Sequence, residues 1–127
     1  MPKLFLFLAA ANGFLSVALG AFAAHGLSAR LSEQMLSTFQ TGAQYHMYHT
    51  LALFGVGVLS LHYPGSTLLR YSGFLFLAGT LIFSGSLYVL ALSGIRWLGA
   101  ITPIGGVAFL AGWGALAWFA LSEPLAS

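Results

Sequence analysis

The feature that most limits what this chain can fold into is its long runs of apolar residues without an ionisable side chain. The first run, Leu4 to Ala24, has 21 residues, and about 20 helical residues cross the roughly 30 Å hydrocarbon core of a bilayer. Only 5% of the chain is charged and 59% is hydrophobic, whereas a soluble domain has about 25% charged residues. The sequence therefore predicts an all-α integral membrane protein.

The few charged side chains mark the edges of the apolar runs. Charge is costly at the bilayer centre, so this distribution is what crossing helices require. Four basic and two acidic residues are too few for a nucleic-acid surface. The chain has no cysteine, which excludes disulfides, thiol catalysis and thiolate metal sites. The charged residues are Lys3, Arg30, Glu33, Arg70, Arg96 and Glu123.

Helix-breaking residues divide the 127-residue chain into four predicted crossings of a single membrane domain. Pro64 and Gly65 end the second crossing, and Gly94 ends the third. Pro103 either begins the last helix or kinks one that starts near Trp97. Four crossings place both termini on one side, and the basic residues do not decide which side that is. The predicted crossings are residues 4–24, 45–63, 68–93 and 103–120.

Between the first two crossings, residues 28–44 have an amphipathic pattern. Apolar side chains recur at helical spacing from Leu27 to Phe39, and polar side chains from Arg30 to Gln44 form the opposite stripe. This pattern predicts an amphipathic helix that lies at the membrane interface as a connector, or that folds over one end of the bundle as a lid. We expect the second crossing to continue directly from it.

The richest polar stretch is the start of the second crossing. His46 and His49 are three residues apart, and Tyr45 and His49 are four apart, so each pair shares a helix face. His25 ends the first crossing and is expected at a similar depth, with Gln44 close by. Three imidazoles together could bind a metal ion, relay protons or supply two axial ligands to a haem. The alternative is structural: the histidines hydrogen-bond between helices or to the backbone.

A second polar group lies in the third crossing and at the start of the fourth. Ser84, Ser86, Tyr88 and Thr102 could line a small cavity, or their hydroxyls could bond the preceding turn or a neighbouring helix. The chain has no Ser-His-Asp arrangement, carboxylate pair, phosphate-binding loop or nucleotide fingerprint. We therefore expect no enzymatic activity and no bound cofactor.

Four blocks of the sequence resemble those of a known family, the small bacterial inner-membrane proteins YgdD and YwdK with their eukaryotic relatives. The blocks are GAFAAHGL at 20–27, FQTGAQYHMYH at 39–49, FSGSLY at 83–88, and ITPIGG at 101–106 followed by Gly112 and Trp113. The resemblance covers nearly the whole chain and departs at Ala23 or Ala24, where a second glycine is expected. It implies four helices, the bacterial plasma membrane and no assigned function or catalytic residue.

The resemblance also bears on the first helix and on function. Ala21 to Ala23 has the form of a signal-peptidase site, but it lies inside the first block, which favours a retained helix. We expect a non-enzymatic membrane protein that binds lipid, a second copy or another membrane protein. The rival interpretation is a small permease-like or ion-handling protein that uses His25, His46 and His49 as its titratable or ligating groups.

Overall fold

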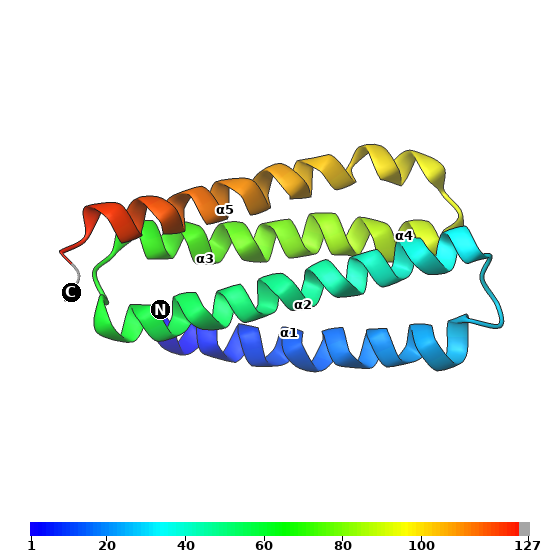
Figure 1. Cartoon of the computed structure of the whole chain (residues 1–127), viewed down its shortest axis with the longest axis horizontal. Coiled ribbons are helices and arrows are strands. Elements are labelled where there is room, and N and C mark those ends of the chain that lie inside the picture. Colours follow the sequence, from blue (N-terminus) through cyan, green and yellow to red (C-terminus); the bar gives the residue numbers. More distant parts are fainter. Residues whose placement is uncertain (125–127) are drawn as a thin grey trace.

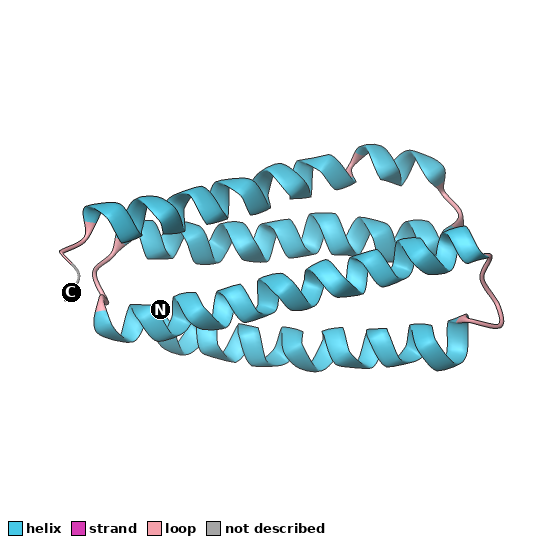
Figure 2. Cartoon of the chain, viewed as in Figure 1, coloured by secondary structure: helices cyan, strands magenta, loops and turns pink. Residues whose placement is uncertain are grey.

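The computed structural model describes residues 1–124, and within that part every regular element is helical (Figure 2). Helix α1 (Pro2–Phe22) continues into a short π-helix, η1 (Ala23–Leu27), and α2 (Glu33–His62) follows. The third rod consists of α3 (Thr67–Gly79), a π-helical turn η2 (Thr80–Ser84) and α4 (Gly85–Ser93). A 3₁₀ turn, η3 (Arg96–Ala100), leads into α5 (Thr102–Ser122). The described chain thus forms four long helical rods, in agreement with the predicted all-α class.

The rods are arranged as two antiparallel pairs that lie side by side (Figure 1). Helix α1 packs most extensively on α2, and α3 packs most extensively on α5. The N-terminus, the α2–α3 connection and the end of α5 lie at one end of the bundle, while the other two connections lie at the opposite end. Both described ends of the chain therefore lie at the same end of the bundle.

The helix boundaries follow from local capping chemistry. The Ser32 hydroxyl accepts a hydrogen bond from the Met35 N–H and caps α2, and Ser66 caps α3 in the same way. Gly94, with φ +75°, ends α4 in the left-handed conformation that glycine adopts without strain. Pro103 lies in the first turn of α5, where its missing N–H costs nothing.

The amphipathic segment differs from the sequence expectation. Residues 28–32 form a turn, and the rest of the expected 28–44 helix is the first part of the continuous 30-residue α2. Its apolar side is buried against η2 and α4: the rings of Phe39 and Tyr88 on α4 are 4.8 Å apart, and the Gly42 carbonyl accepts a hydrogen bond from Ser84 in η2. A separate interfacial or lid helix is not observed, because this stripe contacts a neighbouring helix along the bundle.

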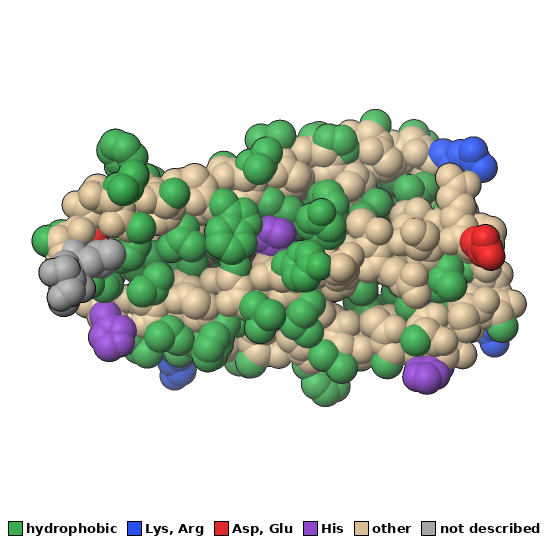
Figure 3. Space-filling model, in the orientation of Figure 1, with side chains coloured by type: hydrophobic (Ala, Val, Ile, Leu, Met, Phe, Trp, Pro, Cys, Tyr) green, Lys and Arg blue, Asp and Glu red, His purple; other side chains and the backbone are tan. Residues whose placement is uncertain are grey.

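Large apolar side chains are exposed on all four rods, and on the face that Figure 3 shows, the charged side chains lie towards its two ends. Within residues 1–124, three helical rods are long and apolar enough to cross a membrane: Pro2–Leu27, Thr67–Ser93 and Arg96–Ser122. Helix α2 is long enough but less apolar, since it carries three histidines and three glutamines. The core between the rods is rich in phenylalanine, with Phe5, Phe39, Phe76 and Phe119 almost fully buried.

Candidate functional site

A buried histidine links three helices in the middle of the bundle. The imidazole of His46 on α2 lies 2.8 Å (Nε2) from Asn12 Oδ1 on α1 and 2.9 Å (Nδ1) from Tyr88 Oη on α4. The Asn12 amide nitrogen donates to the Leu8 carbonyl at 2.8 Å, one turn back in α1. Since His46 is only 4% exposed, both ring nitrogens bond to the protein's own side chains.

The directions of these hydrogen bonds can be assigned from the chemistry of the partners. A carbonyl only accepts, so the Asn12 amide nitrogen faces Leu8 and its Oδ1 faces His46. Oδ1 also only accepts, so His46 carries a proton on Nε2 and donates it to Asn12. In a neutral imidazole, Nδ1 then accepts the hydroxyl proton of Tyr88. The result is a directed chain from Tyr88 through His46 and Asn12 to the backbone of α1.

The second buried histidine has the opposite tautomer. The Trp113 indole on α5 donates its N–H to His49 Nε2 at 3.1 Å, and an indole cannot accept. Nε2 must therefore be bare, and Nδ1 carries the proton and donates it to the Tyr45 carbonyl at 2.8 Å. The imidazole also stacks on Phe109, with ring centroids 3.5 Å apart and planes 8° from parallel. His49 thus joins α2 to α5, whereas His46 joins α2 to α1 and α4.

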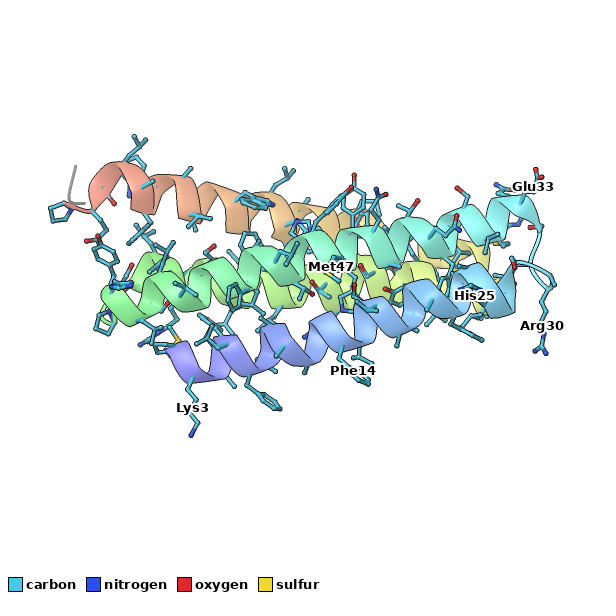
Figure 4. The ribbon with its side chains drawn as sticks, turned by 60° about the horizontal axis from the view of Figure 1, so that its bottom comes forward. Lys3, Phe14, His25, Arg30, Glu33 and Met47 are labelled. Atoms are coloured by element: carbon cyan, nitrogen blue, oxygen red, sulfur yellow. The ribbon has the colours of Figure 1, made fainter. Side chains whose placement is uncertain are left out.

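His25 does not join the other two histidines. It lies exposed in the π-helical turn at the end of α1 (Figure 4), and no group of three potential metal-ligating side chains occurs in the part of the chain that the structure describes. The expectation of similar depth was wrong because α2 begins at Glu33 and not at Tyr45. The 12 residues from Glu33 to Gln44 lie along the bundle ahead of the expected start of the crossing. At 1.5 Å per residue, they place His46 roughly 18 Å further from that end of the bundle than expected.

The remaining candidate residues bond mainly within the protein. Gln44 is exposed and donates to Tyr48 Oη at 2.6 Å, and Tyr45 supplies its carbonyl to His49. Ser84 is buried and donates to the Gly42 carbonyl at 2.8 Å. The hydroxyls of Ser86 and Thr102 lie 2.6 Å apart and join α4 to α5.

Sequence reasoning missed two partners of the histidines. Asn12 is the only asparagine of the chain and interrupts the first apolar run, and a lone amide in such a run signals a buried polar contact. Trp113 was noted only within a family block. Its partner could not be inferred, because the rotation of α5 about its own axis is not encoded in any local pattern.

Two shallow grooves open on the sides of the bundle. One, of about 430 Å³, lies between α2 and α5, where His49, Phe83, Phe109 and Trp113 form much of its wall. The other, of about 370 Å³, lies between α1 and α2 and is lined in part by Gly13 and Thr50. Both are walled mainly by apolar side chains and face the surface that lipid or another membrane helix would contact.

A helical bundle with an apolar outer surface, charges at its ends and polar links in its interior defines an integral membrane protein. The chain belongs to the family described as "Protein of unknown function (DUF423)", whose model matches residues 19–106. It is 49% identical over 111 residues to UPF0382 membrane protein YwdK of Bacillus subtilis, covering 87% of this chain and 90% of the relative. No solved structure matches it.

Two further bacterial relatives support the same family membership. The chain is 45% identical over 111 residues to UPF0382 inner membrane protein YgdD of Escherichia coli, covering 87% of this chain and 84% of the relative. It is 47% identical over 118 residues to a UPF0382 membrane protein of Haemophilus influenzae, covering 93% and 94% of the two chains. The resemblance noted in the sequence is thus confirmed, and the chain is a multi-pass protein of the bacterial inner membrane.

Proposed function

We propose that this chain is a non-enzymatic membrane protein that crosses the bilayer four times and acts by binding lipid or another membrane protein along its sides. The observation that carries the proposal is the state of the two buried histidines. All four ring nitrogens of His46 and His49 are bonded to groups of the protein itself. The polar interior therefore holds the helices together, and the surface remains for recognition.

The four-crossing arrangement requires α2 to span the membrane although it is less apolar than its neighbours. Its 30 residues extend about 45 Å, which exceeds the hydrocarbon core of roughly 30 Å. Four of its polar side chains face the bundle interior, where His46, His49, Thr50 and Ser60 are at most 6% exposed, whereas exposed ones such as Gln34, Gln40 and Gln44 lie in its first half. From His49 to Ser60, the polar side chains of α2 are therefore kept away from lipid.

The rival function, ion or proton handling by His25, His46 and His49, has less support. A metal ligand or proton carrier needs a ring nitrogen that is free to bind, and those of His46 and His49 are occupied. Haem ligation needs two free imidazole nitrogens on facing helices, whereas His25 lies exposed at one end of the bundle. Transport would require these hydrogen bonds to break during each cycle.

The two functions can be separated by reading the histidine tautomers directly. In protein with ¹⁵N-labelled imidazoles reconstituted in lipid, we expect His46 to show a protonated Nε2 and His49 a protonated Nδ1 at neutral pH. Proteoliposomes should show no proton flux above protein-free liposomes, and purified protein should hold no stoichiometric metal. A flux that disappears in His49→Ala but persists in His62→Ala, an exposed histidine at the end of α2, would establish the rival function instead.

A further inference from the structure

The outer face of α1 carries a stripe of residues for which the monomer gives no packing reason. Ala10, Gly13, Val17 and Gly20 recur at helical spacing and lie partly or fully exposed. A Cβ added at Gly20 would meet nothing within 4 Å, and one at Gly13 would only touch the Thr50 methyl at 3.6 Å. Glycine inside a helix is less stable than alanine by about 0.5–1 kcal/mol, so these glycines cost stability without serving this fold.

The groove beside this stripe contains an unpartnered hydroxyl. Thr50 lines the groove between α1 and α2 and is 5% exposed, and its Oγ1 is the one buried side-chain oxygen or nitrogen without a hydrogen-bond partner in residues 1–124. Six other hydroxyls in the described residues donate to the carbonyl four residues earlier, and Thr50 does not. They belong to Ser28, Thr38, Thr41, Ser60, Ser93 and Thr102.

We propose that this face is a homodimer interface, in which α1 of a second copy packs against α1 and the groove that Thr50 lines. Small residues let two helix backbones approach closely in lipid, and threonine hydroxyls hydrogen-bond across such contacts. Threonine in a helix can bond a carbonyl of its own preceding turn, and the Thr50 hydroxyl does not make that bond in this structure. A partner backbone carbonyl is the acceptor that such a close approach supplies.

The face is complementary to itself, which is the reason to assign a second copy as the partner. Beside the groove stand large exposed side chains: Phe14 is 77% exposed on the outer side of α1 (Figure 4), and Leu51 and Phe54 on α2 are 61% and 53% exposed. A twofold axis along the membrane normal brings the projections of each copy to the groove of the other. Copies inserted in the same orientation then place α1 parallel to α1.

This inference names the partner of the lateral surface on which the proposed function rests. The experiment uses the full chain in bilayers, where the natural absence of cysteine allows single-site labelling. Val17→Cys should cross-link to a covalent dimer, whereas Leu81→Cys, 77% exposed on the third rod, should not. A chain that stays monomeric on dilution in lipid, or cross-links equally at both sites, overturns the dimer. The tautomer and flux measurements, by contrast, decide the proposed function.

Substitutions separate the interface from the fold. Gly20→Leu should abolish the dimer and leave the monomer folded, since the position is open in the monomer. Gly114→Leu on α5 is the matched control: its position is equally open, and it should leave the dimer intact. Thr50→Val should weaken dimerisation about eightfold, because a twofold dimer loses two such hydrogen bonds of about 0.6 kcal/mol each, and Thr50→Ser should restore it. A dimer unaffected by Gly20→Leu would show that another face is used. Should Gly20→Leu fail to fold, the Val17→Cys cross-link still decides.

Discussion

The contact between α5 and the π-helical turn η2 offers a test of the packing in which one helix supplies its own control. Gly105 is buried, and a Cβ built on it would lie 2.8 Å from both Cα and Cβ of Phe83. Those atoms belong to or adjoin the backbone and cannot swing away as the end of a flexible side chain can. Gly105→Ala therefore has to separate the two helices. Gly114→Ala, also on α5, meets nothing within 4 Å.

The difference between these two variants isolates the steric cost. Each substitution gains the same helix propensity, about 0.5–1 kcal/mol, so that term cancels. Overpacking a close contact typically costs about 1–3 kcal/mol, and we expect Gly105→Ala to be less stable than Gly114→Ala by that amount. Reversible unfolding in mixed micelles, followed by tryptophan fluorescence and circular dichroism, measures both. Equal free energies of unfolding would refute the close approach of α5 to η2.

Two further substitutions test the polar links by the same unfolding measurement. Ser84→Ala removes the donor to the Gly42 carbonyl and should lower the free energy of unfolding by about 0.6 kcal/mol, the average for such bonds in membranes. An unchanged free energy of unfolding would mean that the bond is not formed. His46→Ala leaves Asn12 Oδ1 and Tyr88 Oη unpartnered and opens a cavity, so we expect a loss of about 2–5 kcal/mol. A loss for His46→Ala no larger than that for Ser84→Ala would contradict its role as the link between three helices.

Much of the fold could be read from the sequence because the bilayer imposes simple physical limits. The cost of charge in hydrocarbon confines ionic side chains to the ends of apolar runs, and the bilayer thickness sets the length of those runs. Capping residues such as Ser66 and the glycine at 94 then mark boundaries by local hydrogen bonding and backbone conformation. These rules depend only on neighbours in sequence, and they predicted the helical class and the end of α4.

The candidate site was less predictable because its geometry depends on the register between helices. Spacing along α2 shows that His46 and His49 share a broad face, but not that one contacts Asn12 and the other Trp113. Starting the second crossing at residue 45 displaced the histidines towards one membrane face, so that His25 appeared to be their neighbour. A one-dimensional pattern gives rotation about a single helix axis and leaves the offset between two helices open.

Helix α2 shows why average hydropathy alone would undercount the rods of this bundle. Three rods satisfy a simple criterion of length and apolarity. Helix α2 does not, and it packs on α1, α3 and α4 and contacts α5 through His49. The average counts the buried imidazoles and hydroxyls of α2 together with outward residues such as Leu51 and Phe54, which are 61% and 53% exposed. It therefore does not separate the side of a helix that faces the bundle from the side that faces out. The inner side of α2 depends on its neighbours, because His46 and His49 have all their partners only when α1, α4 and α5 supply Asn12, Tyr88 and Trp113. These three side chains, each on a different helix, therefore determine how the buried histidines of α2 pack in the bundle.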